Sequence, residues 1–184
     1  MSKKYIIKNA IDLANPMLGT KIINCSDEFI ENFNNIFEKN SSITISAEKQ
    51  RPFNNKHDMI EVFINEFDDL DIDSKKNILI KHPDLGIKLK ITNDLTEMSK
   101  KEQRNVGLDN CTEDEFLLFN RMNDEYKLKF SIPFIFAVKG ANKSIIIDEF
   151  KRRLTNEDID LEIAESIKQV KKIAKFRLDE IINE

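Results

Sequence analysis

Apolar residues recur every three or four positions over most of the chain, which is the spacing of one face of an α-helix. One such stripe lies in residues 29–37 and follows Ser26, a residue type that caps helix starts. A second lies in residues 59–67 and follows Asn54-Asn55. The pattern therefore predicts two amphipathic helices that begin near these polar residues.

A third, shorter helix is expected to begin at Ser74. It should end near His82, because Pro83 disfavours helical geometry at the residue before it. Residues 84–98 have no clear period and are expected to form a loop.

Local signals also place the elements of the second half of the chain. Residues 99–102 and residues 112–115 both fit the capping-box pattern of Ser or Thr followed three positions later by Glu, so each should open a helix. Residues 132–138 are apolar with a proline near their start, and this composition is typical of an extended segment. Helices are expected again over residues 144–154 and from Asn156 to the end of the chain.

Composition agrees with a helical protein, since the 184 residues include only four glycines and four prolines. We therefore predict an all-α, single-domain multi-helix bundle over residues 26–184, with one short extended segment near residues 132–138. Residues 1–25 are predicted to be an N-terminal extension, to which the sequence assigns no role.

Charge and targeting signals exclude several classes of function. The formal net charge is −4 and the lysines are interleaved with acids, so nucleic-acid binding is not expected. No apolar run could span a membrane and the N-terminus lacks a signal-peptide core, so we expect a cytoplasmic protein without membrane contact. The two histidines and two cysteines have no metal-ligand spacing, so neither a metal site nor a disulfide is expected.

His82 is the first candidate for chemistry. It stands just past a predicted helix end, where the helix dipole favours a cation, and Pro83 restricts its backbone. Imidazole gives and takes protons near neutral pH, which makes it the usual general acid or base. A histidine that merely caps the helix is the simpler interpretation of this position when it is taken alone.

Ser99, Glu102 and Gln103 are the second candidate. Their spacing places them on one side of the first turn of a predicted helix, where backbone N–H groups attract anions. A hydroxyl, a carboxylate and an amide gathered there suit a polar, anionic small molecule. The capping box itself, with Glu102 bonded to the backbone of Ser99, explains the same residues without a ligand.

Residues 132–138 and Arg177 offer two further ways to bind a ligand. An extended segment without a full set of partners has backbone N–H and C=O groups for the edge of a heterocycle, although burial in the core explains the same run. Arg177 lies in the apolar stretch 173–178, where its guanidinium suits a ligand carboxylate. A surface salt bridge is the ordinary alternative.

These stretches, taken together and in order, resemble one family. They are Arg51-Pro52-Phe53, His82-Pro83-Asp84-Leu85-Gly86, Ser99-Lys100-Lys101-Glu102-Gln103, Met122-Asn123, Tyr126, Lys129-Phe130, Pro133-Phe134-Ile135, Ile173-Ala174 and Arg177-Leu178. The pattern, over about residues 26–182, is similar to the 2-oxo-4-hydroxy-4-carboxy-5-ureidoimidazoline (OHCU) decarboxylases. The order and spacing of several motifs carry this resemblance, because each motif alone is common.

The resemblance implies an all-helical, usually homodimeric enzyme, without metal or organic cofactor, that converts OHCU to (S)-allantoin in the breakdown of urate. It implies that His82 is the catalytic acid/base, and we assign Glu102 to act beside it. The expected substrate-binding residues are Pro83, Ser99, Lys100, Lys101, Gln103, Phe134, Ile135, Phe136, Ala137, Val138 and Arg177.

Two departures from the family pattern are visible. Ser131 stands where the family commonly has glycine, and the chain has no tryptophan, although the family often has one near Ile43. Neither removes a catalytic group. The alternative to an enzyme is a non-catalytic helical module that binds a purine-derived ligand or a protein partner, in which the motif residues serve only as caps and packing groups.

Overall fold

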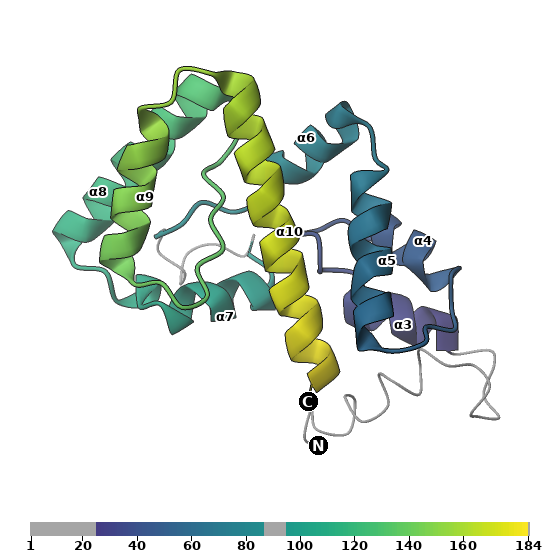
Figure 1. Ribbon diagram of the computed structural model, residues 1–184. Coiled ribbons are helices and arrows are strands. Elements are labelled where there is room, and N and C mark those ends of the chain that lie inside the picture. Colours follow the sequence, from purple (N-terminus) through teal and green to yellow (C-terminus); the bar gives the residue numbers. More distant parts are fainter. Residues whose placement is uncertain (1–24, 87–94, 184) are drawn as a thin grey trace. The chain divides into compact units, whose positions relative to one another are not determined.

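The computed structural model describes residues 25–86 and 95–183 and is all-helical over these ranges, with no strand (Figure 1). The helices are α3 (Cys25–Phe33), α4 (Ser42–Glu48), α5 (Lys56–Asp68), α6 (Ile72–Ile80), α7 (Glu97–Asn105), α8 (Glu113–Phe130), α9 (Lys143–Leu154) and α10 (Ile159–Asn183), with a 3-10 turn η2 (Leu108–Asn110). The predicted all-α fold is confirmed. The extension predicted over residues 1–25 lies, except for Cys25, outside the described residues.

The described chain divides into two compact units. Of the described residues, unit 1 contains 25–71 and 173–183, and unit 2 contains 72–86 and 95–172. Helix α10 supplies its first part to unit 2 and its last part to unit 1. The expectation of one domain over residues 26–184 stays a prediction.

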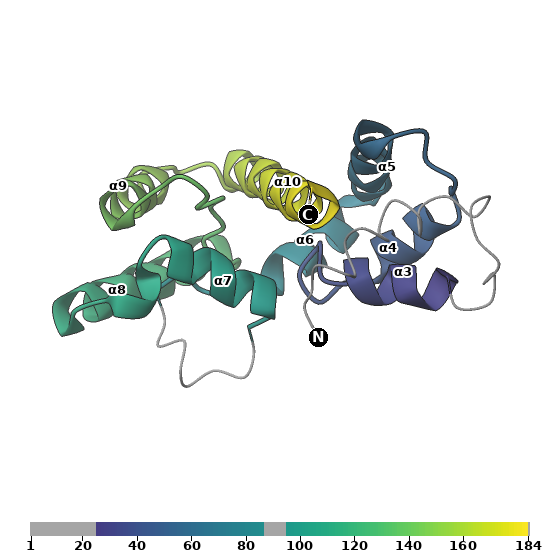
Figure 2. The same ribbon diagram turned by 90° about the horizontal axis from the view of Figure 1, so that it is seen from below.

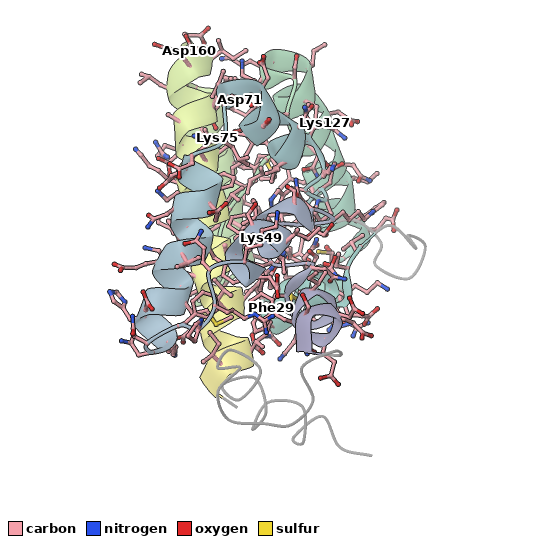
Figure 3. The ribbon with its side chains drawn as sticks, turned by 90° about the vertical axis from the view of Figure 1, so that its right-hand side faces the viewer. Phe29, Lys49, Asp71, Lys75, Lys127 and Asp160 are labelled. Carbon is pink, nitrogen blue, oxygen red and sulfur yellow. The ribbon has the colours of Figure 1, made fainter. Side chains whose placement is uncertain are left out.

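Unit 1 is built around aromatic side chains from α3 and α5. Figure 3 labels Phe29 on α3, whose ring centroid lies 4.8 Å from that of Phe33. Phe37 stacks on Phe67 of α5 at 5.0 Å, and all four rings are completely buried. The apolar stripe predicted over residues 29–37 is therefore real, although α3 ends at Phe33 and Phe37 follows in a turn.

Most predicted helix starts are confirmed within one or two residues. Asn55 caps α5 and accepts a hydrogen bond from the backbone N–H of Asp58, as expected. Thr112 opens α8 with a complete capping box that includes Glu115. Ser26 is not a cap, because α3 already begins at Cys25.

Unit 2 consists of α6 to α9 and the first part of α10, and α8 lies beside α9 (Figure 1 and Figure 2). Residues 133–138 connect these two helices without helix or strand, so the extended segment is confirmed. It begins after Ser131, which ends α8 in the left-handed conformation with φ +57°. That conformation favours glycine, which gives a physical reason for the glycine common in the family at this place.

Within the described ranges, no helix combines the length and the apolar character needed to cross a membrane.

Candidate active site

The loop that follows α6 carries His82 and is tied to two other helices. The backbone N–H of His82 donates to the carbonyl of Leu79 at 3.0 Å and so completes the end of α6. Gln103 of α7 then holds the loop twice, since its Nε2 donates to the carbonyl of Asp84 at 3.0 Å and its Oε1 accepts from the N–H of Gly86 at 3.1 Å. His82 itself is only 7% exposed. Its backbone therefore has little freedom on either side.

Helix α8 holds the same loop through residues spaced four apart on one face. Asn123 donates from Nδ2 to the carbonyl of Leu85 at 2.9 Å, and Lys127 donates to Asp84 Oδ2 at 2.8 Å. Phe119 packs so closely against Gly86 that a Cβ there would lie under 3.0 Å from its side chain. The hydrogen bond to Asp84 raises the pKa of Lys127, so its cationic form persists.

Asn123 has a further feature that bears on ligand binding. The residue is 1% exposed, and its Oδ1 is a buried acceptor without a hydrogen-bond donor among the described residues. A buried carbonyl oxygen without a donor costs free energy, which a ligand N–H or a water would offset. Asn123 appeared in the family pattern, but sequence reasoning assigned it no role.

Helix α7 begins three residues earlier than predicted. Thr96 is its N-cap and accepts a hydrogen bond from the N–H of Ser99 at 3.2 Å. The predicted capping box of Ser99 and Glu102 is therefore wrong. Because Ser99 lies inside the helix, the simpler explanation for a Ser-x-x-Glu run there is removed.

The first turns of α7 have one buried and one accessible side. Ser99 and Gln103 are buried, at 3% and 1% exposure, and Glu102 between them is half-buried. Lys100 is also half-buried and pairs with Glu97 at 2.8 Å, whereas Lys101 is exposed. Among these predicted site residues, Gln103 bonds directly to the loop that carries His82.

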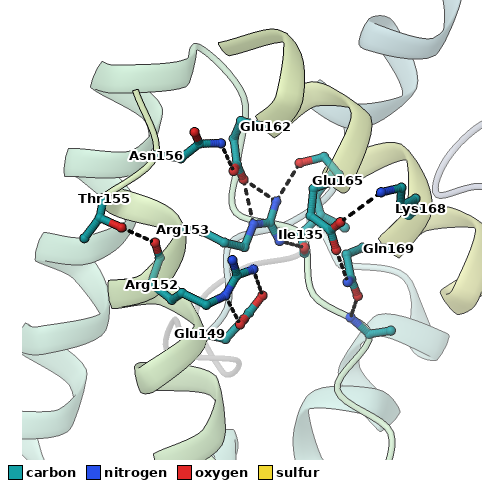
Figure 4. Close-up of polar contacts among 12 residues, drawn as sticks. Ile135, Glu149, Arg152, Arg153, Thr155, Asn156, Glu162, Glu165, Lys168 and Gln169 are labelled. Carbon is teal, nitrogen blue, oxygen red and sulfur yellow. Dashed lines mark hydrogen bonds and ion pairs between the residues drawn. The ribbon is translucent and has the colours of Figure 1, made fainter. Parts of the chain in front are cut away.

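The 132–138 segment is held by α9 and α10 (Figure 4). Arg153 of α9 donates from Nη1 to the carbonyl of Ile135 at 2.6 Å, and Gln169 of α10 accepts from the N–H of Ala137 at 3.0 Å. Two of the backbone groups expected to be available for a ligand are thus engaged inside the protein. Phe134, Ile135 and Val138 are buried, whereas Phe136 and Ala137 are half-buried.

Arg153 belongs to a buried polar cluster that sequence reasoning missed. It is 1% exposed and forms an ion pair with Glu162, with Nε 2.6 Å from Oε1. Its Nη2 also donates to the hydroxyls of Tyr126 and Ser166, each at 2.8 Å. Burial raises the pKa of Tyr126 well above its usual value, so its hydroxyl stays protonated and donates to Glu162.

Arg177 lies on the last part of α10, in unit 1. Its side chain is 3% exposed, and Nη1 donates to Glu38 Oε2 at 3.1 Å and to the carbonyl of Asn35 at 3.0 Å. The surface salt bridge considered from the sequence is therefore wrong, because the ion pair is buried. Glu38 has a φ of +21°, an unusual backbone conformation at the residue that holds this arginine.

Within the described ranges, no group of three or more His, Cys, Asp or Glu side chains gathers in a way that suits a metal ion.

A sequence profile described as "OHCU decarboxylase" matches residues 25–179. The chain is 35% identical over 157 residues to 2-oxo-4-hydroxy-4-carboxy-5-ureidoimidazoline decarboxylase of Amia calva, covering 85% of this chain and 89% of that one. It is 33% identical over 159 residues to the uric acid degradation bifunctional protein of Bacillus sp. strain TB-90, covering 86% of this chain but only 31% of that protein.

Solved structures show the same fold. A crystal structure of OHCU decarboxylase in the presence of (S)-allantoin matches with a TM-score of 0.68 at 16% identity, over 83% of this chain and 99% of that one. A crystal structure of (S)-allantoin synthase matches with a TM-score of 0.69 at 21% identity, over 96% of this chain and 53% of that one. The chain thus spans about half of the synthase and nearly all of the decarboxylase.

Proposed function

Because the chain belongs to the OHCU decarboxylase family, we propose that it catalyses the decarboxylation of OHCU to (S)-allantoin in the breakdown of urate. The observation that carries the proposal is the buried His82, whose loop is held by Gln103 and Asn123 on two separate helices. A catalytic proton donor needs such a fixed position, because misplacement by an ångström reduces the rate strongly.

The chemistry that this chain must supply is limited. When the bond between the ring carbon and the carboxylate breaks, its electron pair enters the neighbouring unsaturated, nitrogen-rich ring, and carbon dioxide leaves. His82 handles the proton of the 4-hydroxyl or delivers one to the product carbon, and delivery to one face gives a single enantiomer. No organic cofactor or metal is then required as an electron sink.

The remaining predicted residues hold the substrate. Glu102 orients His82 or disfavours the substrate carboxylate by its like charge. Ser99, Gln103 and Arg177 bind polar groups of the substrate, and Lys100 and Lys101 add positive charge at the same helix. We propose that Pro83 and the segment from Phe134 to Val138 complete the binding surface.

The test is turnover of freshly made OHCU, followed through the optical activity of the product. We expect His82→Ala to lower the rate about a hundred- to ten-thousand-fold, which is the usual worth of general acid–base catalysis. His57→Ala is the matched control, because the only other histidine of the chain is exposed on α5 and pairs with Glu61. A folded His82→Ala variant with the wild-type rate and handedness would show that His82 is not the proton carrier.

We propose that the protein acts in the cytoplasm as a homodimer, and sedimentation equilibrium should then give twice the chain mass of 21.5 kDa. If the wild-type protein binds (S)-allantoin but does not turn over OHCU, the non-catalytic module is the better description.

A further inference from the structure

Arg153 and Gln169 form hydrogen bonds to the backbone of the 132–138 segment at two residues that are separated by one. The carbonyl of Ile135 and the N–H of Ala137 belong to residues two apart, and in extended backbone such groups point toward the same edge. The rings of Phe134 and Phe136 support this geometry, since their centroids lie 6.2 Å apart and the rings are stacked. One edge of the segment is therefore hydrogen-bonded to Arg153 and Gln169. The backbone N–H and C=O of Phe136 point toward the opposite edge.

The side chains of Arg153 and Gln169 are themselves held in place by other residues (Figure 4). The guanidinium of Arg153 lies 4.8 Å from the ring centroid of Phe134 and bonds to Glu162. Gln169 is 3% exposed and donates from Nε2 to Glu165 at 2.7 Å. Each of the two side chains is thus fixed by contacts other than its hydrogen bond to the segment.

Stability alone is a poor explanation for this arrangement. Removing two charges from water is costly, and packed apolar residues often replace a buried ion pair without loss of stability. An arginine offers something that apolar residues do not, which is a rigid set of donors that fixes the position of one backbone carbonyl. The arrangement is better suited to fixing geometry than to strengthening the core.

We propose that Arg153 and Gln169 are positioning residues, which hold the edge of Ile135 and Ala137 so that the N–H and C=O of Phe136 face the substrate. This inference rests on the proposed function. An extended residue presents a donor beside an acceptor on one edge, which complements the –NH–C(=O)– edge of a cyclic amide or urea. The two side chains thereby determine which backbone groups form hydrogen bonds to the substrate ring.

Gln169→Leu tests the proposal by removing the acceptor of the Ala137 N–H. We expect KM for OHCU to rise about tenfold, the equivalent of one lost hydrogen bond, with kcat changed much less. The double variant Gln169→Glu with Glu165→Gln exchanges the two functional groups, keeps the net charge and again offers an acceptor to Ala137. It should restore KM to within about threefold of wild type.

Ser166→Ala is the matched control, because Ser166 bonds to Arg153 in the same cluster and has no hydrogen bond to the segment. It should lower the melting temperature and leave KM unchanged. If Gln169→Leu behaves like this control, or if the double variant fails to restore KM, Gln169 is merely structural and the inference is overturned.

Titration of ¹⁵N-labelled wild-type protein with (S)-allantoin gives a second measurement that does not depend on turnover. The amide signal of Phe136 should shift strongly and that of Ala137 little. A shift confined to Ala137 would overturn the inference while the proposed function stands. Wild-type protein that neither turns over OHCU nor binds (S)-allantoin would overturn both.

Discussion

Gly86 shows how one residue without a side chain places the loop that carries His82. It has a φ of +72°, and a Cβ added there would meet the side chain of Phe119. Its N–H is also one of the groups held by Gln103. Conformation, space and hydrogen bonding all constrain the same residue, four positions after His82.

Gly86→Ala should therefore destabilise the protein by about 2–5 kcal/mol, the sum of a left-handed alanine and an overpacked contact. Gly140→Ala is the matched control, since Gly140 also has a positive φ but nothing lies within 4 Å of the added Cβ. It should cost only about 1–2 kcal/mol and leave turnover intact. Urea unfolding measures both, and equal costs for the two variants would show that the contact with Phe119 is unimportant.

Single residues also show the limits of the sequence analysis. His82 and Gln103 could be singled out because a proline or a motif stood beside them. Arg153 could not, because it follows another arginine and resembles a surface residue. Its only signal is spacing, since it continues the buried stripe of Ile146 and Phe150. Its partner Glu162 lies nine residues later, on the next helix. Periodicity within one helix does not reveal such a contact between two helices.

At the scale of elements, capping motifs predicted the start of a helix correctly where no other good N-cap residue stood nearby. Thr112 and Glu115 opened α8 as predicted. The same pattern failed at Ser99, because Thr96 three residues earlier is also a favoured cap residue and the helix began there. Two valid caps within one turn cannot be ranked from local sequence, since packing of the helix decides between them.

Glu115 also joins α8 to α9 through Lys143, with Nζ 2.6 Å from Oε2. The hydrogen bond from Lys143 lowers the pKa of Glu115 below its ordinary value of 4.5. A lowered folded-state pKa means that the stabilising contribution is present above the unfolded value and is lost as the pH falls through the folded one.

Glu115→Gln should accordingly be less stable than wild type near neutral pH, and the gap in the free energy of unfolding should close as the pH falls below about 5 and through the lowered pKa of Glu115. Denaturant unfolding at a series of pH values measures this gap. Asp114→Asn is a suitable control, because it changes a neighbouring exposed acid in the same helix turn. A gap that stays constant with pH would contradict the assigned pair.

At the scale of the whole molecule, each compact unit has, among its described residues, an arginine–glutamate pair that is removed from solvent. Unit 1 has Arg177 with Glu38, and unit 2 has Arg153 with Glu162. All four side chains are at most 3% exposed. Sequence reasoning predicted helices and their apolar faces, but it assigned charged residues to the surface by default and so missed both pairs as features of the interior.

Arg177→Met should cost about 3–5 kcal/mol, because it leaves the carboxylate of Glu38 buried without its cation. The double variant with Glu38→Met should recover much of this loss, since two apolar side chains replace the pair. A double-mutant cycle in urea gives the coupling. Additive losses would show that the pair contributes no interaction. If Arg177 binds substrate, activity should stay low even where stability returns.

Two glutamines each accept a hydrogen bond from the backbone N–H of a different segment. Amide hydrogen exchange can therefore follow the opening of each segment separately. Gln103 holds the amide of Gly86 and Gln169 holds the amide of Ala137, each through a buried side-chain oxygen. Solvent deuterium can replace either amide proton only when its glutamine lets go. The two exchange rates therefore report separately on the opening of the histidine loop and of the extended segment. Whether a ligand slows one of them or both then reveals which of the two segments it holds closed.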